Sequence, residues 1–266
     1  MTSVQRAMPW LVAVAALVLA FTAWQAPPAV FTPDREVLFQ VSTIDALMIG
    51  DYTGSATFAT LAESGDFGLG TFDALDGEMV ALNGTFWQAT ADGQVHRADP
   101  SMTTPFAVVT WFDSDIVIPY EHSSDLDAIM AATDTRLISE NYFYAVAISG
   151  TFDFVTVRSF PRQEPPYPPL AEAVANQFTY QDVTGTLVGF RSPAYVTGIN
   201  VPGYHLHFIS DDRTQGGHLL DCRMREGNGA LDITPRMTLW LPETVSFIGA
   251  DLTGDRTQDV AAVERK

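Results

Sequence analysis

Three histidines of this 266-residue chain lie close together in the sequence and could share one metal ion. His205 and His207 alternate along an apolar run that is typical of a β-strand, so both imidazoles point to the same face. The polar, glycine-containing segment 211–217 is typical of a hairpin loop, which would return the chain and bring His218 beside the pair. Three neutral imidazoles suit zinc or a similar divalent ion and leave a coordination position open for a substrate. We therefore predict a catalytic metal site.

A strand histidine is more often a surface residue or a satisfied core residue than a metal ligand. Here, however, three of the five histidines fall between positions 205 and 218, which favours a shared site. The other two have ordinary explanations: His96 follows the Asp92-Gly93 turn, and His122 lies near a predicted helix start. We expect both of them to be solvated.

The amino-terminal segment, residues 1–26, has the pattern of a signal peptide. Arg6 precedes an apolar run over about 9–24, which is short for a membrane span, and prolines follow at 27 and 28. An uncleaved amino-terminal anchor is the alternative. Both interpretations predict an exported protein, periplasmic or secreted, whose folded part begins near Phe31.

The composition disfavours several classes of partner and mechanism. The formal net charge of −18 disfavours nucleic acid and anionic membrane surfaces as partners of the mature domain. Lys266 is the only lysine and lies at the end of the chain, so a Schiff-base mechanism is disfavoured. Cys222 is the only cysteine, which rules out an internal disulfide, and its apolar neighbours indicate core packing.

Regular glycine and proline punctuation predicts many short strands and few helices, an α+β fold that is mostly β. Turn dipeptides at 76–77, 83–84 and 92–93 separate alternating apolar runs and indicate a β-meander. The other elements expected before residue 160 are strands over 37–41, 105–112, 142–149 and 151–159, a short helix capped by Ser42 or Thr43, and helices over 57–63 and 124–133.

Five prolines between positions 161 and 169 cannot sustain a helix or a central strand and predict a rigid crossing between two closely packed units. We expect an N-terminal mixed sheet with short helices over 31–165. We expect a C-terminal antiparallel sheet or small barrel, carrying the metal site, over 166–266. The elements expected in this second unit are a helix over 170–178 and strands centred on Leu187, His207, Leu219, Leu231, Leu239 and Phe247.

Two further charged residues have both a structural and a functional interpretation. Glu78 directly follows the Asp76-Gly77 turn, which either aims its carboxylate across a cleft or simply leaves an exposed strand residue. Arg158 lies between apolar neighbours, where it either forms a structural ion pair or binds a substrate carboxylate through two hydrogen bonds.

Five longer segments of the sequence form a specific combination: TIDAL at 43–47, GDFGLGTFDALDGE at 65–78, TPFAV at 104–108, RSFPRQEPPYPPL at 158–170 and YHLHF at 204–208. With them the sequence, from about Val37 to its end, resembles alpha-acetolactate decarboxylases. The resemblance implies a two-domain α and β protein, commonly a homodimer, that binds one zinc ion per chain. It also implies a small-molecule substrate, acetolactate, which is converted to acetoin and CO2.

The resemblance also implies roles for individual residues. His205, His207 and His218 correspond to the zinc ligands, and Glu78 lies close to the metal or its bound water. The family also places a glutamate from the carboxyl-terminal tail in the site, for which Glu264 fits best and Glu243 second. Arg158 corresponds to the active-site arginine, Thr71 to a pocket threonine, and Phe160 and Arg162 stand where smaller or lysine residues are expected, which changes the pocket shape.

This set of residues suits the reaction that the resemblance implies. Loss of the carboxylate from (S)-2-acetolactate leaves an enediolate, whose charge a zinc ion can stabilise as a Lewis acid, so no organic cofactor is needed. Arg158 would orient the carboxylate or the intermediate. Either Glu78 or Glu264 would manage the proton that completes (R)-acetoin, and the sequence leaves open which of them does so.

Two alternatives compete with a decarboxylase. A cupin-like metal protein also opens with His-x-His on a strand, but it would place a glutamate soon after the pair and its last histidine much later than His218. An exported binding module with a purely structural zinc would hold the ion in a closed four-ligand site.

Overall fold

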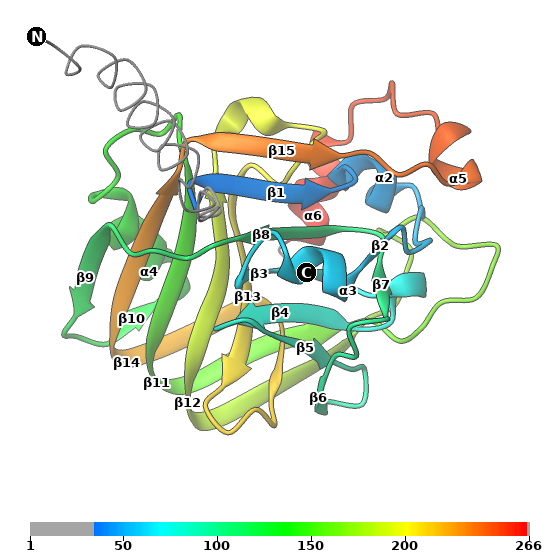
Figure 1. The fold of residues 1–266 in the computed structure, drawn as a ribbon. Coiled ribbons are helices and arrows are strands. Elements are labelled where there is room, and N and C mark those ends of the chain that lie inside the picture. The colour runs from blue at the N-terminus through cyan, green and yellow to red at the C-terminus, as the bar shows by residue number, and fades with distance from the viewer. Residues whose placement is uncertain (1–34, 265–266) are drawn as a thin grey trace, which may run out of the picture. The chain divides into compact units, whose positions relative to one another are not determined.

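The computed structural model describes residues 35–264. The predicted leader, residues 1–26, lies outside this range and stays a prediction. Within it, no helix combines the length and the apolar character that crossing a bilayer requires. The described chain is mostly β, as the sequence predicts, and its strands form two large sheets and one small one (Figure 1).

The first large sheet is mixed and contains seven strands in the order β15-β1-β8-β3-β4-β5-β6. Only the β1–β15 pair is parallel. Strands β3 to β6 follow one another along the chain and pair antiparallel, which confirms the predicted meander. The strands of this sheet are β1 (Val37–Val41), β3 (Phe67–Thr71), β4 (Glu78–Leu82), β5 (Thr85–Ala89), β6 (Val95–Arg97), β8 (Ala107–Thr110) and β15 (Arg236–Trp240).

The second large sheet is antiparallel and is built on three long strands that lie side by side in Figure 1. β11 pairs with both β12 and β14, β12 pairs with β13, and β13 pairs back with β14, so these pairings form a closed ring. The strands are β9 (Ile116–Tyr120), β10 (Ser124–Asp125), β11 (Phe143–Ser159), β12 (Asn176–Ser192), β13 (Gly203–Ser210) and β14 (Gly216–Thr234).

Helices and short elements complete the described chain. Thr43 caps α2 by accepting a hydrogen bond from the Ala46 amide at 3.2 Å, which confirms one of the two predicted caps, and Thr57 caps α3 in the same way. The remaining elements are α2 (Ile44–Met48), α3 (Phe58–Ala62), α4 (Leu126–Asp134), α5 (Val245–Ile248), α6 (Thr257–Val263), the 3-10 turns η1 (Asp73–Leu75) and η2 (Ala194–Val196), and the pair β2 (Ala56–Thr57) and β7 (Thr103–Thr104).

The main core lies where the two large sheets face each other. It joins Leu69 and Val80 of the first sheet to Val188 and Ile209 of the second, all of them buried. A second cluster packs α4 against the other side of the long strands, and a third packs α3 against the first sheet. Each of the two large sheets contains strands from both sides of residue 165, and the predicted domain boundaries stay a prediction.

Several predicted elements differ from the structure, and among them the strands centred on Leu219 and Leu231 are one continuous strand, β14. The strands expected over 142–149 and 151–159 are one continuous strand, β11, because Gly150 does not turn the chain. A Cβ at Gly150 would lie 2.4 Å from the Glu226 carbonyl oxygen, so the glycine allows β14 to lie close to β11 at this position. Residues 170–178 do not form a helix, because Phe178 already pairs with Val157 in the sheet. Phe247 belongs to the short helix α5, not to a strand.

Candidate metal centre

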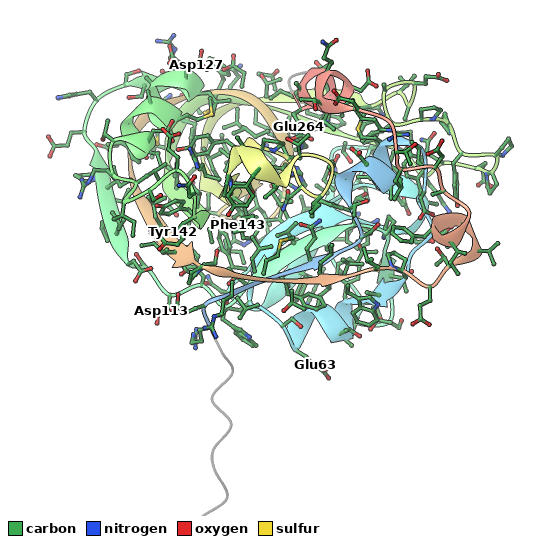
Figure 2. All side chains as sticks on the ribbon, turned by 90° about the horizontal axis from the view of Figure 1, so that it is seen from above. Glu63, Asp113, Asp127, Tyr142, Phe143 and Glu264 are labelled. Atoms are coloured by element: carbon green, nitrogen blue, oxygen red, sulfur yellow. The ribbon has the colours of Figure 1, made fainter. Side chains whose placement is uncertain are left out.

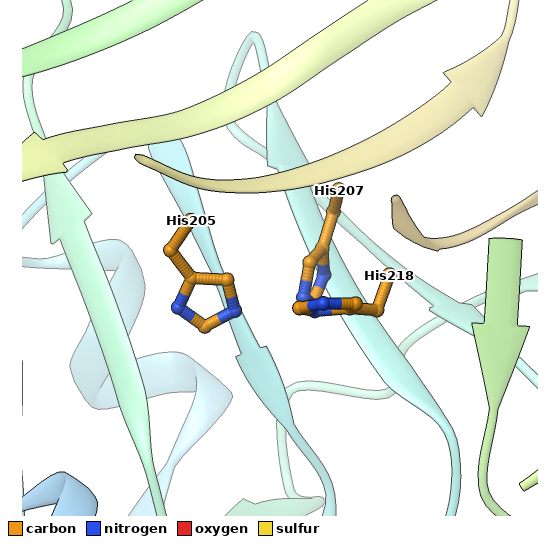
Figure 3. A group of neighbouring side chains, drawn as sticks. All are labelled: His205, His207 and His218. Atoms are coloured by element: carbon orange, nitrogen blue, oxygen red, sulfur yellow. The ribbon is translucent and has the colours of Figure 1, made fainter. Parts of the chain in front are cut away.

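The three histidines of the predicted site lie together on neighbouring strands. His205 and His207 belong to β13, His218 lies near the start of β14, and His207 and His218 are direct cross-strand partners. All three are at least nine-tenths buried, and one nitrogen from each lies within 4.8 Å of the others. Figure 3 shows the three rings turned toward a common point. Their centroids lie 5.1–5.2 Å apart. This cluster could hold one metal ion.

Burial keeps the imidazoles in the neutral form that binds metals. It lowers the pKa of His205 to about 3, with a further contribution from the Arg158 charge, and it holds the pKa values of His207 and His218 well below their usual range. His207 Nδ1 lies 2.8 Å from the Met79 carbonyl oxygen. The neutral ring therefore donates from Nδ1 to that carbonyl, which leaves Nε2 as its free acceptor.

Two carboxylates face the histidines from different elements. An oxygen of Glu78, at the start of β4, lies 3.6 Å from His207 Nε2. An oxygen of Glu264, just after α6, lies 3.7 Å from the Nε2 atoms of both His205 and His218. Burial raises the pKa of Glu78 to about 8 and that of Glu264 to about 7, against the opposing effect of the Arg158 charge. A bound divalent cation would lower both pKa values.

The bend before Glu78 is fixed by its neighbours. Gly77 has a φ of +91°, and its amide donates to the Phe160 carbonyl at 3.0 Å. The buried Thr71, opposite Glu78 in the β3–β4 register, donates its hydroxyl to the Gly77 carbonyl at 2.6 Å. Thr71 therefore holds the bend from which Glu78 enters the site.

Arg158 is buried beside the histidines and is the cross-strand partner of His218. Its guanidinium donates to the Val263 carbonyl on α6, and its central carbon lies 5.3 Å from the Phe160 ring centroid. The Arg158 Nε atom is buried and has no hydrogen-bond partner among the described residues. Arg158 thus contacts the carboxyl-terminal segment and still has a donor for a ligand.

These side chains surround a small cavity of about 30 Å³, enough for roughly one water molecule. All seven predicted site residues line it: Thr71, Glu78, Arg158, His205, His207, His218 and Glu264. The other walls are mostly apolar and come from Ile44, Leu47, Gly70, Leu75, Phe106, Phe160 and Leu170.

The two candidates for the tail glutamate, Glu264 and Glu243, lie in different surroundings. Glu264 lines the cavity, whereas Glu243 is exposed in the segment before α5. Arg162 is exposed and pairs with Asp73, while Phe160 lines the cavity. The apolar wall from α2 and the Met79 carbonyl were not predicted, because neither an apolar residue nor a backbone carbonyl carries a chemical signature in sequence.

Known proteins are similar to this chain both in sequence and in fold. A sequence model of alpha-acetolactate decarboxylase matches residues 38–254. The alpha-acetolactate decarboxylase of Methanosarcina mazei is 48% identical over 240 residues, which cover 90% of this chain and 83% of that protein. The alpha-acetolactate decarboxylase of Methylococcus capsulatus is 48% identical over 233 residues, covering 87% and 88% of the two chains.

The fold is similar to that of a crystallised relative. The X-ray structure of alpha-acetolactate decarboxylase from Bacillus subtilis strain 168 superposes with a TM-score of 0.85 at 35% sequence identity. The superposition covers 86% of this chain and 100% of that one.

Proposed function

Because the chain belongs to the alpha-acetolactate decarboxylase family, whose members are carboxy-lyases, we propose that it converts (S)-2-acetolactate to (R)-acetoin and CO2 with zinc as its cofactor. The observation that carries this proposal is the convergence of three buried, neutral imidazoles with two carboxylates and one arginine around a single cavity. The roles of individual residues below are part of the proposal.

The residues present fit a zinc ion. His205, His207 and His218 would hold it, since they offer three nitrogen donors in the neutral state and no thiolate competes for the ion. The Met79 carbonyl orients the His207 ring, as such hydrogen bonds do in metal sites. When bound, zinc supplies a Lewis acid that stabilises the negative charge left on the substrate as CO2 departs.

Arg158 is the proposed group that orients the substrate carboxylate. Its Nε atom is buried without a partner among the described residues, and an unpaired buried donor is costly unless a ligand satisfies it. A guanidinium also matches the geometry of a carboxylate better than any other cation does. The apolar walls formed by Phe106, Phe160 and Leu170 exclude water and strengthen this contact.

A proton must replace CO2 on the carbon that loses it. Glu78 and Glu264 face the cavity from different elements, and burial raises the pKa of both, which opposes the lowering that a bound cation would cause and favours proton transfer by either carboxyl. Delivery of that proton from one fixed carboxyl would give a single enantiomer of acetoin. Thr71 would contribute by fixing the bend that carries Glu78.

The deciding experiment measures acetoin formed from racemic acetolactate by the purified protein, before chelation, after chelation and after the return of zinc. We expect half of the racemate to react, with activity lost on chelation and regained with zinc. Metal-independent activity, or none with zinc bound, would contradict the proposal. If chelation unfolds the protein without a separable loss of activity, a structural zinc is the better interpretation.

The proposal includes a homodimer and export, which the resemblance and the amino-terminal sequence indicate. Light scattering of the purified protein measures the mass of the assembly, and amino-terminal sequencing of protein from cells locates any cleavage near residue 26.

A further inference from the structure

The carboxyl-terminal helix α6 delivers Glu264 to the metal centre, yet it is too short to hold a position by itself. Its seven residues make about two turns, and isolated helices of this length are not stable in water. Two of its side chains, Val260 and Val263, are buried in the main core with Ile44 and Leu47 of α2. Figure 2 shows Glu264 at the end of this helix. Contacts with the rest of the chain must therefore fix where the Glu264 carboxylate lies.

Arg256, the residue before α6, makes polar contacts with three parts of the chain. Its guanidinium donates to the carbonyls of Gly254 at 3.0 Å and Asp251 at 2.9 Å. It also lies 3.7 Å from a carboxylate oxygen of Asp45, and the two side chains are only 17% and 10% exposed. The Arg256 carbonyl accepts the first helical hydrogen bond of α6, from the Val260 amide at 2.9 Å. One residue thus joins the preceding loop, the helix start and Asp45.

Asp45 is a firm attachment point because α2 is itself held in place. All five residues of α2 are buried, and the amides of Ile44 and Asp45 donate to the carbonyls of Ile199 and Gly198 at 2.9 and 3.4 Å. The same helix supplies Ile44 and Leu47 to the wall of the metal cavity. The helix α2 therefore both supports the carboxyl-terminal segment and forms part of the cavity wall.

We propose that the Arg256–Asp45 ion pair anchors α6 so that the Glu264 carboxylate lies against the imidazoles, which makes both members of the pair positioning residues for the reaction. This inference rests on the proposed function, in which Glu264 acts at the metal centre. Loss of the pair leaves α6 attached by its two valines and by the Arg158 contact with the Val263 carbonyl. The helix can then shift, and displacements near 1 Å cost up to about 100-fold in rate.

The test compares Arg256→Gln and Asp45→Asn with Glu264→Gln and with a matched control, Arg225→Gln. Arg225 also pairs with aspartates, Asp153 and Asp182, but it is 45% exposed and does not line the metal cavity. Three quantities are measured: hydrogen exchange of the amides of Val260 and Glu264, the affinity for Co2+, and kcat for acetoin formation.

We expect faster amide exchange in both anchor variants and a kcat reduced about 10-fold or more, toward that of Glu264→Gln. Combining Arg256→Gln with Asp45→Asn should cause no further loss, because each change already breaks the same ion pair. We also expect Co2+ affinity to fall by about 10-fold, because a carboxylate near the ion is withdrawn. The direction of the change in Co2+ affinity in Arg256→Gln distinguishes two effects. Removal of the Arg256 positive charge alone would strengthen Co2+ binding, whereas loss of the anchor weakens it. The control should match the wild type in all three measurements.

Unchanged exchange in Arg256→Gln, or an unchanged or higher Co2+ affinity, would overturn the anchor. Faster exchange with wild-type kcat would also overturn it, because α6 would then not position a group for the reaction. If Asp45→Asn fails to fold, Arg256→Gln decides the question alone. A wild-type protein that binds Co2+ but forms no acetoin with zinc contradicts the proposed function, while exchange and affinity still decide whether the anchor exists.

Discussion

Burial sets the charge of each side chain at the metal centre. The same loss of hydration that lowers the pKa of the three imidazoles raises the pKa of Glu78 and Glu264. Near neutral pH the site thus combines nitrogen donors that are ready to bind a cation with carboxyl groups that can carry a proton. Arg158 supplies a fixed positive charge to the same cavity.

Glu78→Gln and His207→Ala separate the proton-transfer role from the ligand role. The glutamine variant should bind zinc with wild-type stoichiometry, but its kcat should fall about 100-fold or more. General acid-base groups typically accelerate a reaction by a factor of that size. The alanine variant removes one of three nitrogen donors and should lose both metal and activity.

Metal content by atomic spectroscopy and acetoin formation are measured on the same samples, and Glu243→Gln, at an exposed position, is the control. Equal loss of metal in Glu78→Gln and His207→Ala would make Glu78 an essential ligand instead of a proton-transfer group.

At the residue scale, sequence reasoning predicted all seven polar side chains that line the cavity but not the residues proposed to support them. The alternation of His205 and His207 and the loop before His218 were sufficient to predict a shared site. Glu264 was predicted only through the family resemblance, since no spacing links it to residues more than forty positions earlier. Arg256 and Asp45 could not be predicted at all, because their pairing depends on how two short helices pack.

The metal centre depends on the register of three neighbouring strands. Arg158 on β11 is opposite His218 on β14, and His218 is in turn opposite His207 on β13. On the other side of β13, Gly189 of β12 allows a very close approach: a Cβ there would lie 2.0 Å from the His205 carbonyl oxygen. The position of His205 therefore depends on a residue without a side chain.

Gly189→Ala should separate β12 from β13 and displace His205. We expect destabilisation of about 2 kcal/mol or more, as in overpacked cores, together with weaker Co2+ binding. Urea unfolding and metal titration measure the two effects. Gly249→Ala is the control, because Gly249 has an ordinary φ of −88° and a Cβ there would meet its nearest neighbour at 3.3 Å. If both variants bind Co2+ with equal affinity, this close approach does not fix the site.

At the element scale, the short capped helices and the meander were predictable because their signals are local, as with Thr43, Thr57 and the Asn83-Gly84 turn. The long strand β11 was not, because Gly150 looks like a turn residue until β14 is placed against it. The order of strands in the sheets also could not be predicted, since β1 pairs with β15, about two hundred residues later.

For the molecule as a whole, one buried carboxyl should make stability depend on pH. Asp232 is fully buried, accepts a hydrogen bond from the Asp113 amide at 3.2 Å, and has one oxygen without a partner among the described residues. Burial, together with the charges of Glu36 and Asp115, raises its pKa to about 7. The folded state therefore binds this proton more tightly than the unfolded state does.

With a raised folded-state pKa, the stabilisation from Asp232 is complete below its ordinary pKa and is lost as the pH rises toward 7. Between pH 5 and pH 8 the wild type should lose about 2 kcal/mol more of its free energy of unfolding than Asp232→Asn does. Chemical denaturation at both pH values measures the difference, with the exposed Asp211→Asn as the control. A decline that persists in Asp232→Asn must come from other groups.

The hydrogen bond from His207 to the Met79 carbonyl ties the second large sheet to β4 of the first. A chain that has folded only its long strands lacks the carbonyl that orients this ring, and it also lacks Glu78 on the same strand. We therefore expect the proposed zinc ion to bind late, after both sheets have met. Retention of that ion would then report that the two sheets have been assembled correctly.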